Sequence, residues 1–254
     1  MYYITNNLAK KAYVPIRTLF KMVTNLQANK RVKMIDKSKI IEAYNFRHAC
    51  KIFDAKKKIS EDDFLTILEA GRLSPSSFGF EPWKFLVVQH SKLREKLLPV
   101  TWGAQGSLPT ASHFVIILAR KQKSMHYSSS YIEHIMSDVH HLPKEALETR
   151  KELYKTFQEK DFSLLESQRA TFDWAGKQAY IALANMMTTA AMLEVDSCAI
   201  EGFKSKELED VMASEFNVDT EMFGVAVMVA FGYRKESQKV KTRQNMQDIT
   251  EWYH

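Results

Sequence analysis

Apolar residues recur at two different spacings along the chain, and each spacing predicts a different kind of element. Intervals of three and four residues predict a short helix over residues 37–46 and a second helix from Ser60 to about Leu73. Ser60 precedes three acidic residues, a pattern typical of a helix N-cap with a negatively charged first turn. Two further helices are predicted over residues 93–98 and over residues 205–216.

Short continuous runs of apolar residues are typical of buried strands. Such runs predict four strands, over residues 85–89, 113–119, 195–200 and 224–233. Strands and helices therefore alternate along the chain. This alternation alone leaves open both a doubly wound α/β fold and an α+β fold.

The segment over residues 172–193 differs from the other predicted helices because apolar side chains surround it. Those side chains include Trp174, Tyr180, Ile181, Leu183, Met186, Met187, Met192 and Leu193. We expect this helix to be buried on every side, against its own sheet and against a second subunit. Residues 121–168, in contrast, are polar and highly charged, and we expect them to form an inserted helical region that covers a site.

The composition is that of a protein with a sizeable core. The chain has 254 residues, of which 45% are hydrophobic and 26% are charged. Its longest apolar runs fall far short of the roughly 20 residues that a membrane-spanning helix needs. The two cysteines, Cys50 and Cys198, follow no secretory pattern, which favours a cytoplasmic protein whose thiols pack rather than react. No metal site is predicted, because the histidines and cysteines lack the spacing of metal ligands.

The positive charge is confined to one end of the chain. The whole sequence carries a net charge of +6, and residues 1–33 alone carry +7 with no acidic residue, which leaves −1 for residues 34–254. We therefore predict a basic N-terminal extension over residues 1–33 and one domain over residues 34–254. The extension is either a disordered tail or a targeting or membrane-surface arm. It is the only feature that favours binding to nucleic acid or to an anionic membrane.

Four separated segments carry side chains suited to a ligand. Residues 47–51 (RHACK) and residues 241–243 (KTR) hold cations that suit a phosphate. Residues 74–83 (SPSSFGFEPW) combine serine hydroxyls with flat aromatic rings. Residues 199–203 (AIEGF) place a glycine after a strand, where backbone N–H groups can approach a planar cofactor. Taken singly, the two basic segments are explained equally well as solvated surface. Residues 74–83 are explained equally well as a turn in which Trp83 anchors the next strand.

In this order and spacing, the four segments resemble those of the flavin-dependent nitroreductase family. The resemblance extends over residues 36–251 and is greatest to the bacillus-type NAD(P)H nitroreductases, while residues 1–33 lie outside it. It is carried by RHACKIFD, GRLSPSSFGFEPWKF, TWGAQGSLPTASHF, FDWAGKQAYIALANMM, AIEGF and FGYRKES followed by KTR.

The resemblance implies a site for the phosphate of FMN. In this family an arginine before a histidine and two basic residues near the C-terminus hold that phosphate, which implies this role for Arg47, Lys241 and Arg243. By the same resemblance, His48 lines the pocket, and Ala49 stands where relatives often carry serine.

The resemblance also implies neighbours for the flavin ring. Lys51 matches a lysine near N1 and O2 of the isoalloxazine, where an ammonium group stabilises the negative charge of the reduced ring. Glu201 and Gly202 match positions whose backbone amides approach N5, the atom that exchanges hydride, and Ile200 before them is expected to contact the cofactor. Gln105 matches an amide side chain that contacts the ribityl chain or the ring edge.

The same resemblance implies a homodimer. Pro75, Ser76 and Ser77 match a loop that reaches FMN from the partner subunit, so each site is expected to need two chains. Glu81 stands where many relatives carry glutamine or asparagine, and an ionised carboxylate close to the flavin would disfavour its reduced form. The implied fold is an α+β three-layer sandwich, with a mixed, largely antiparallel sheet flanked by helices in an intertwined homodimer.

The implied activity is that of an FMN-dependent oxidoreductase. Hydride is expected to pass from NAD(P)H through flavin N5 to nitroaromatic, quinone or related acceptors by a ping-pong mechanism. Flavin reductase, enone reductase and dehalogenase are the alternatives within the family. The absence of a GxGxxG motif is consistent with nicotinamide bound transiently on the flavin. This hypothesis needs small-molecule acceptors and no nucleic-acid or membrane partner.

Overall fold

The computed structural model describes residues 35–254. The predictions for the basic extension over residues 1–33, and for a boundary near Met34, fall outside the described residues. No helix within the described range combines the length and the apolar character needed to cross a membrane.

The described residues form one four-stranded sheet. Its strands are β1 (Trp83–Val87), β2 (His113–Arg120), β3 (Asp196–Ile200) and β4 (Phe223–Gly232), in the order β1-β2-β4-β3. All three pairings in this sheet are antiparallel, so a doubly wound parallel fold is excluded and the prediction of a mixed sheet is wrong for residues 35–254. The parallel pairing found there is an isolated bridge between Ala49 and Ser197.

The central strand β2 is buried on both faces, which explains its continuous apolar sequence. Its even-numbered residues from Phe114 to Leu118 pack in one core cluster, and its odd-numbered residues from Val115 to Ala119 pack in the other. The sheet therefore separates two apolar layers, each of which needs a cover of helices.

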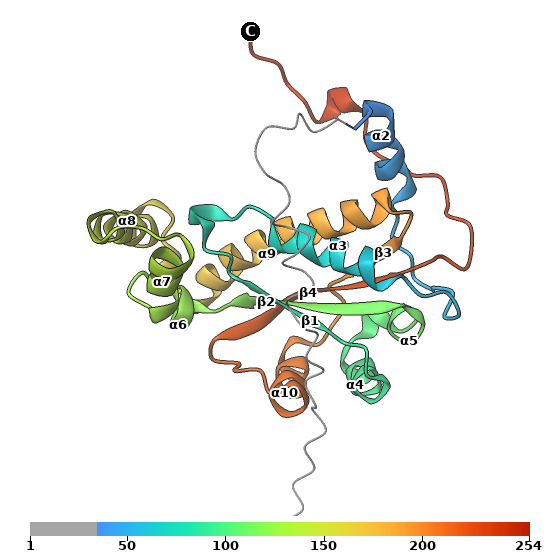
Figure 1. The fold of residues 1–254 in the computed structure, drawn as a ribbon, viewed down its shortest axis with the longest axis horizontal. Coiled ribbons are helices and arrows are strands. Elements are labelled where there is room, and N and C mark those ends of the chain that lie inside the picture. Colours follow the sequence, from blue (N-terminus) through green and yellow to red (C-terminus); the bar gives the residue numbers. More distant parts are fainter. Residues whose placement is uncertain (1–34) are drawn as a thin grey trace, which may run out of the picture.

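Helices cover both faces of the sheet (Figure 1). One face carries α3 (Glu61–Arg72) and α9 (Gln168–Met192), with α2 (Lys37–Phe46) beside them. The opposite face carries α4 (Ser91–Leu97), α5 (Ser107–Thr110) and α10 (Ser205–Phe216). The result is the α+β arrangement of three layers that was expected.

Residues 121–168 are helical, as predicted, and gather at one end of the molecule (Figure 1). They include α6 (Gln122–Met125), α7 (Ser130–His134) and α8 (Lys144–Thr156). A short π-helix follows α7, η4 (Ile135–Val139), and another follows α8, η5 (Phe157–Asp161). Tyr154 is fully buried there, and its hydroxyl donates to the carbonyl oxygen of Met125 at 2.8 Å.

The predicted elements exist, and their bounds differ by a few residues. Helices α2, α3 and α10 match their predicted ranges closely. Helix α9 begins four residues earlier than predicted, because the Ser167 hydroxyl caps it by accepting from the backbone N–H of Ala170 at 3.0 Å. Strand β1 begins two residues earlier than predicted, because Trp83 already pairs with Ala119.

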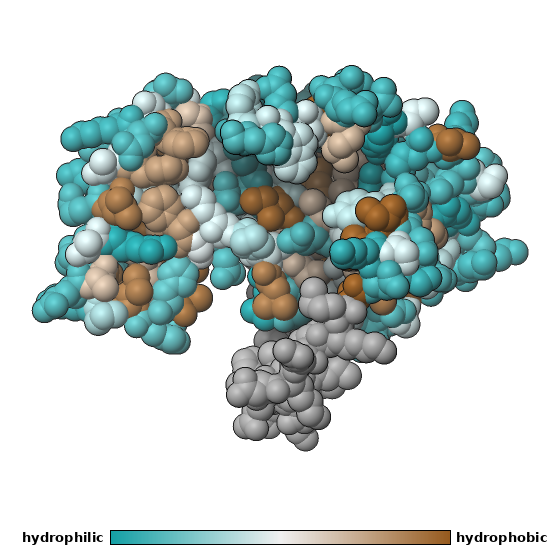
Figure 2. Space-filling model, turned by 90° about the horizontal axis from the view of Figure 1, so that it is seen from above, coloured by the Kyte–Doolittle hydropathy of each residue, from teal (hydrophilic) through white to brown (hydrophobic). Residues whose placement is uncertain are grey.

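Contacts within one chain do not bury α9 on every side, and the expected cover by a second subunit stays a prediction. Tyr180, Ile181 and Met192 are 37%, 38% and 44% exposed. Helix α2 also exposes apolar side chains, with Ile41 60% exposed. In a space-filling view of the side that these helices cover, brown apolar patches lie among teal polar ones (Figure 2). The apolar pattern of α9 is therefore only partly explained by contacts within one chain.

Ser60 provides a test of the local signals that define these helices. Its hydroxyl oxygen accepts from the backbone N–H of Asp63 at 3.1 Å. We expect Ser60→Ala to lower the free energy of unfolding in urea by about 1 kcal/mol, because one N–H of the first turn loses its partner. Ser214→Ala is the matched control, because Ser214 is exposed inside α10, where alanine has the higher helix propensity. Equal losses in both variants would contradict the role of the cap.

Candidate functional site

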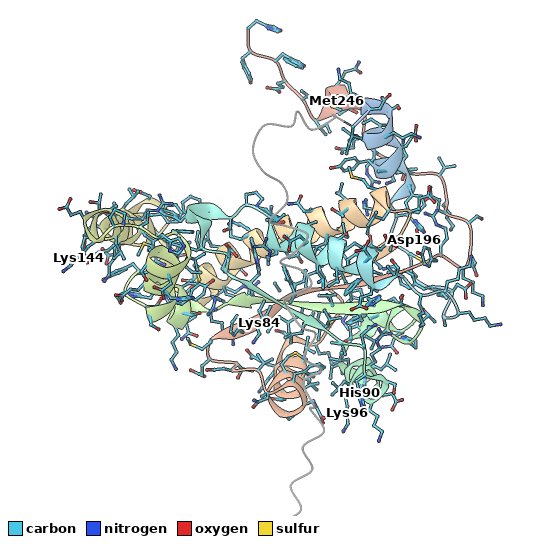
Figure 3. The ribbon with its side chains drawn as sticks, in the orientation of Figure 1. Lys84, His90, Lys96, Lys144, Asp196 and Met246 are labelled. Carbon is cyan, nitrogen blue, oxygen red and sulfur yellow. The ribbon has the colours of Figure 1, made fainter. Side chains whose placement is uncertain are left out.

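A buried ion pair lies at the start of β3. Asp196 is only 2% exposed, and its Oδ2 atom accepts from the backbone N–H and from Nε of Arg234, at 2.8 and 3.0 Å. Arg234 Nη2 also lies 2.7 Å from Oδ1. Figure 3 places Asp196 at the opposite end of the molecule from Lys144 of α8. A buried carboxylate is tolerated only when it is paired in this way.

The same guanidinium fixes the point at which the chain leaves α2. Arg234 Nη2 donates to the carbonyl oxygen of Phe46 at 3.2 Å, and the guanidinium carbon lies 4.2 Å from the centre of the Phe46 ring. The chain then continues beside β3, where the backbone N–H of Cys50 donates to the carbonyl oxygen of Ser197 at 3.2 Å. Residues 47–51 are thereby held along the edge of the sheet.

The predicted phosphate ligands meet at one cavity. This cavity has a volume of about 620 Å³ and is lined by residues 47–52 and 236–243. Its lining includes the predicted site residues Arg47, His48, Ala49, Lys51, Lys241 and Arg243. Five lysine or arginine side chains line it, against one carboxylate, that of Glu236, so the cavity carries an excess of positive charge.

Lys241 connects the two segments of the cavity. Its ammonium group donates to the carbonyl oxygen of Tyr44 at 2.5 Å and to that of Arg47. Burial lowers the pKa of Lys241, and the positive charges of Arg47 and Arg243 lower it further. A pKa lowered by like charges means that these cations repel one another, and an anion bound between them would relieve that repulsion.

His48 is a neutral member of the cavity wall at neutral pH. Its pKa is lowered first by burial and then by the charge of Arg234, and the carboxylate of Asp196 opposes that shift. His48 Nδ1 lies 3.5 Å from Asp196 Oδ1, and it has no hydrogen-bond partner among the described residues. The buried Nδ1 atom therefore faces the ion pair of Asp196 and Arg234.

Lys51 lies between the cavity and β3. Its ammonium group lies 3.5 Å from the thiol of Cys198, which is buried in β3. Burial raises the pKa of Cys198, and Lys51 opposes that shift. Burial also raises the pKa of Cys50 to about 11. Both thiols stay protonated at neutral pH, as expected of cysteines that pack rather than react.

The glycine after β3 is required by a close backbone contact. Gly103 donates its backbone N–H to the carbonyl oxygen of Gly202 at 2.7 Å. A Cβ atom added to Gly202 would lie only 2.7 Å from the Cα atom of Gly103. The contact with residues 102–106 thus accounts for Gly202 in addition to any approach of a cofactor. Glu201 does not line the cavity, and its carboxylate accepts from the hydroxyl of Tyr180 in α9 at 2.5 Å.

Gln105 stabilises the loop to which it belongs. Its side-chain nitrogen donates to the carbonyl oxygens of Leu98 and Thr101, at 2.8 and 2.9 Å. The loop packs closely on the cavity wall, since a Cβ atom on Gly106 would lie 2.7 Å from the carbonyl oxygen of Lys51. The predicted contact of Gln105 with a cofactor stays a prediction.

The serine loop does not reach the cavity of its own chain. Pro75, Ser76 and Ser77 are absent from the cavity lining. The backbone N–H of Ser77 donates to the Gln178 side chain of α9 at 2.8 Å, and the backbone N–H of Glu81 donates to the Ser76 hydroxyl at 2.9 Å. In Figure 1 this loop lies over α9, away from the segment that follows β4. The helical region over residues 121–168, which we expected to cover a site, also contributes nothing to this cavity.

Three structural residues of the site were missed at the level of sequence. Asp196 had a signal, because it is the one charge in an otherwise uncharged run over residues 195–200. Arg234 stands directly after the predicted last strand, but nothing in the sequence pairs it with Asp196. Tyr180 was predicted only as part of an apolar helix, and its contact with Glu201 spans 21 positions.

The fold and the site define an α+β protein with a cavity lined by cations at one edge of its sheet. A family model described as the nitroreductase family matches residues 44–233. YfkO of Bacillus subtilis, named as a candidate NAD(P)H nitroreductase, is 51% identical over 216 residues, which cover 85% of this chain and 98% of YfkO. The chain therefore belongs to the nitroreductase family, and it is an oxidoreductase.

Solved structures have the same fold at low sequence identity. A candidate nitroreductase from Exiguobacterium sibiricum, solved in complex with FMN, has a TM-score of 0.67 and 18% identity, over 87% of this chain and 99% of that one. The gut-bacterial enone reductase CLA-ER has a TM-score of 0.69 and 15% identity, over 87% of this chain and 100% of that one. These two likenesses show the fold alone.

The contact between Gly202 and Gly103 can be tested by a substitution that should destabilise the protein, with a control substitution that should stabilise it. We expect Gly202→Ala to lower the free energy of unfolding by about 1–3 kcal/mol, because the added methyl group meets backbone atoms. Gly176→Ala introduces a methyl group into α9 with no atom within 4 Å, and we expect it to stabilise the protein by about 1 kcal/mol. Urea denaturation measures both. A stable Gly202→Ala protein would contradict the close contact.

Proposed function

We propose that the chain is an FMN-dependent oxidoreductase that takes hydride from NAD(P)H and passes it to nitroaromatic, quinone or related acceptors. The observation that carries this proposal is the convergence of Arg47, Lys51, Lys241 and Arg243 on one cavity in a member of the nitroreductase family. The complex of the Exiguobacterium sibiricum relative with FMN supports the choice of cofactor.

The residues of the cavity fit the phosphate of FMN. Arg47 and Arg243 supply guanidinium groups, which bind phosphate oxygens through two parallel hydrogen bonds. Lys241 is already held between the two segments, so its charge is fixed before a ligand arrives. The mutual repulsion of the three cations provides the driving force for binding an anion with two negative charges.

Lys51 is the residue best placed to act on the flavin ring. FMN, when bound, supplies the ring that accepts and donates hydride. The contact with the Cys198 thiol holds the Lys51 ammonium group beside β3, a few residues from Glu201 and Gly202. A cation fixed there stabilises negative charge on the neighbouring part of the ring and so favours transfer of electrons in pairs.

A second copy of the chain is proposed to complete each site. The serine loop lies outside the cavity of its own chain, and α9 exposes Tyr180, Ile181 and Met192. An apolar helical face of this kind is suited to a symmetric subunit contact. We infer that this contact brings Pro75, Ser76 and Ser77 of one chain to the cavity of the other.

The absorption spectrum of the purified protein tests the proposed function directly. We expect a flavin band in the visible range, either as purified or after addition of FMN, and bleaching of that band by NADH or NADPH. Nitroaromatic compounds and quinones should then restore it. A protein that shows no flavin band with excess FMN would overturn the proposal.

Lys51→Ala tests the role assigned to the ammonium group. We expect the variant to keep its fold and to slow flavin reduction by NAD(P)H about tenfold or more, because the fixed positive charge is lost. Stopped-flow absorbance measures that step. Lys96→Ala is the control, since Lys96 lies on α4, on the face of the sheet opposite to α9 (Figure 3). An unchanged reduction rate in Lys51→Ala would reject Lys51 as the partner of the ring.

Mixing two defective chains tests whether the site is shared. One chain carries Arg47→Ala and Arg243→Ala, and the other carries Ser77→Asp, which sets a negative charge in the loop. Each alone should bind FMN weakly. After co-expression, random pairing gives mixed dimers with one intact site each, so about a quarter of all sites should recover. Normal FMN binding by Ser77→Asp alone, or no recovery in the mixture, would contradict a shared site.

A further inference from the structure

Side chains of the helical region over residues 121–168 bind the backbone of the serine loop, residues 74–83. Arg150 of α8 donates from Nη2 to the carbonyl oxygen of Phe78 at 3.1 Å. His140, which follows η4, has its Nε2 atom 3.1 Å from the carbonyl oxygen of Gly79. Because a carbonyl oxygen can only accept, Nε2 carries the proton in this contact.

Tyr131 of α7 continues this series of contacts. Its hydroxyl shares its proton between the carbonyl oxygens of Phe80 and Glu81, at 2.7 and 2.9 Å. Burial raises the pKa of Tyr131, and the charge of Arg120 opposes that shift, so the hydroxyl stays a donor at neutral pH. Four consecutive carbonyl groups of the loop, those of residues 78–81, are therefore bound by three side chains of one region.

The loop has a backbone conformation that its own residues do not favour. Phe78 and Glu81 have φ angles of 58° and 45°, in the left-handed region that residues other than glycine rarely adopt. Such residues persist where surrounding contacts determine the conformation. The backbone N–H of Ser77 is bound by the Gln178 side chain of α9, and the carbonyl groups are bound by the helical region. The conformation of the loop therefore depends on both neighbours.

We propose that Tyr131, His140 and Arg150 are positioning residues, which hold the serine loop in the conformation that completes the cofactor site of a second copy of the chain. None of the three lines the cation cavity of its own chain. Their role rests on the proposed function, in which the loop reaches the cavity of the partner. Without these donors the loop adopts other conformations as well, and FMN has to restore the one that it binds, at a cost in affinity.

The double variant Tyr131→Phe/Arg150→Met tests this proposal without measuring turnover. It removes two donors but keeps the aromatic ring, whose centre lies 3.3 Å from the guanidinium carbon of Arg120, and the aliphatic stem of residue 150. We expect FMN binding, measured by fluorescence titration of the apoprotein, to weaken about tenfold or more, since each lost hydrogen bond contributes a factor of about five. Hydrogen exchange of residues 76–81 in the apoprotein should become faster.

Tyr154→Phe is the matched control, because its hydroxyl also donates to a backbone carbonyl oxygen of the helical region, that of Met125, at 2.8 Å. Tyr154 is fully buried, so its loss should lower the free energy of unfolding in urea. It should nevertheless bind FMN like the wild type, because no carbonyl group of the loop loses its donor. An equal loss of FMN affinity in this control and in the double variant would overturn the proposal, since general destabilisation would then explain both.

Co-expression shows in which chain the three donors act. The double variant is paired with a chain that carries Arg47→Ala and Arg243→Ala, whose loop is intact. Each mixed dimer then contains one intact cavity facing one intact loop, so about a quarter of all sites should regain the affinity of the wild type. No recovery would overturn the proposal, because the donors would then act on the cavity of their own chain.

Two outcomes separate this inference from the proposed function. If the wild type does not bind FMN at all, the proposed function fails, and the role of the three donors fails with it. If the wild type binds FMN and the double variant binds it equally tightly, the proposed function stands and this inference alone is overturned.

Discussion

The pairing of Asp196 with Arg234 is the interaction on which the site depends. It joins the first residue of β3 to the second residue after β4, and through Phe46 it fixes the end of α2. The two segments that line the cavity, residues 47–52 and 236–243, start directly after Phe46 and two residues after Arg234. Removing one partner of such a buried pair typically costs about 3–5 kcal/mol, because the other charge is left uncompensated. The ion pair therefore holds in place side chains that repel one another.

The residues that stabilise the fold and the residues that line the cavity lie in different parts of the protein. The sheet and its two apolar layers provide the stability, and the cavity lies at their edge, where cations remain in contact with solvent. Arg47, Lys241 and Arg243 are close enough for their charges to lower the pKa of Lys241. A site built in this way is electrostatically unsatisfied until an anion occupies it, which is what a cofactor held by its phosphate requires.

Local sequence signals predicted most of the fold. The N-cap at Ser60, the apolar runs of β2 and β4 and the length of α10 depend on neighbouring residues, and each element was found where it was expected. Strand direction was not determined by such signals, because pairing is set by contacts distant in sequence. The resemblance to the family grouped Arg47, Lys241 and Arg243, and the structure brings these side chains to one cavity, while their role as phosphate ligands stays a prediction. It was silent on Asp196, Arg234 and Tyr180, whose roles depend on partners 38, 38 and 21 positions away. The exposed side chains of α9 also depend on distant contacts, because α9 is expected to pack against a second chain as well as against its own sheet.

The central claim is that the cavity recognises a flavin by its phosphate. Comparison of FMN with riboflavin, which has the same ring and ribityl chain but no phosphate, tests this claim most directly. Fluorescence titration of the apoprotein at low and high salt gives both affinities. The account predicts that FMN binds far more tightly than riboflavin and that the difference shrinks as salt is added. Equal affinities for the two flavins, or a difference insensitive to salt, would contradict it.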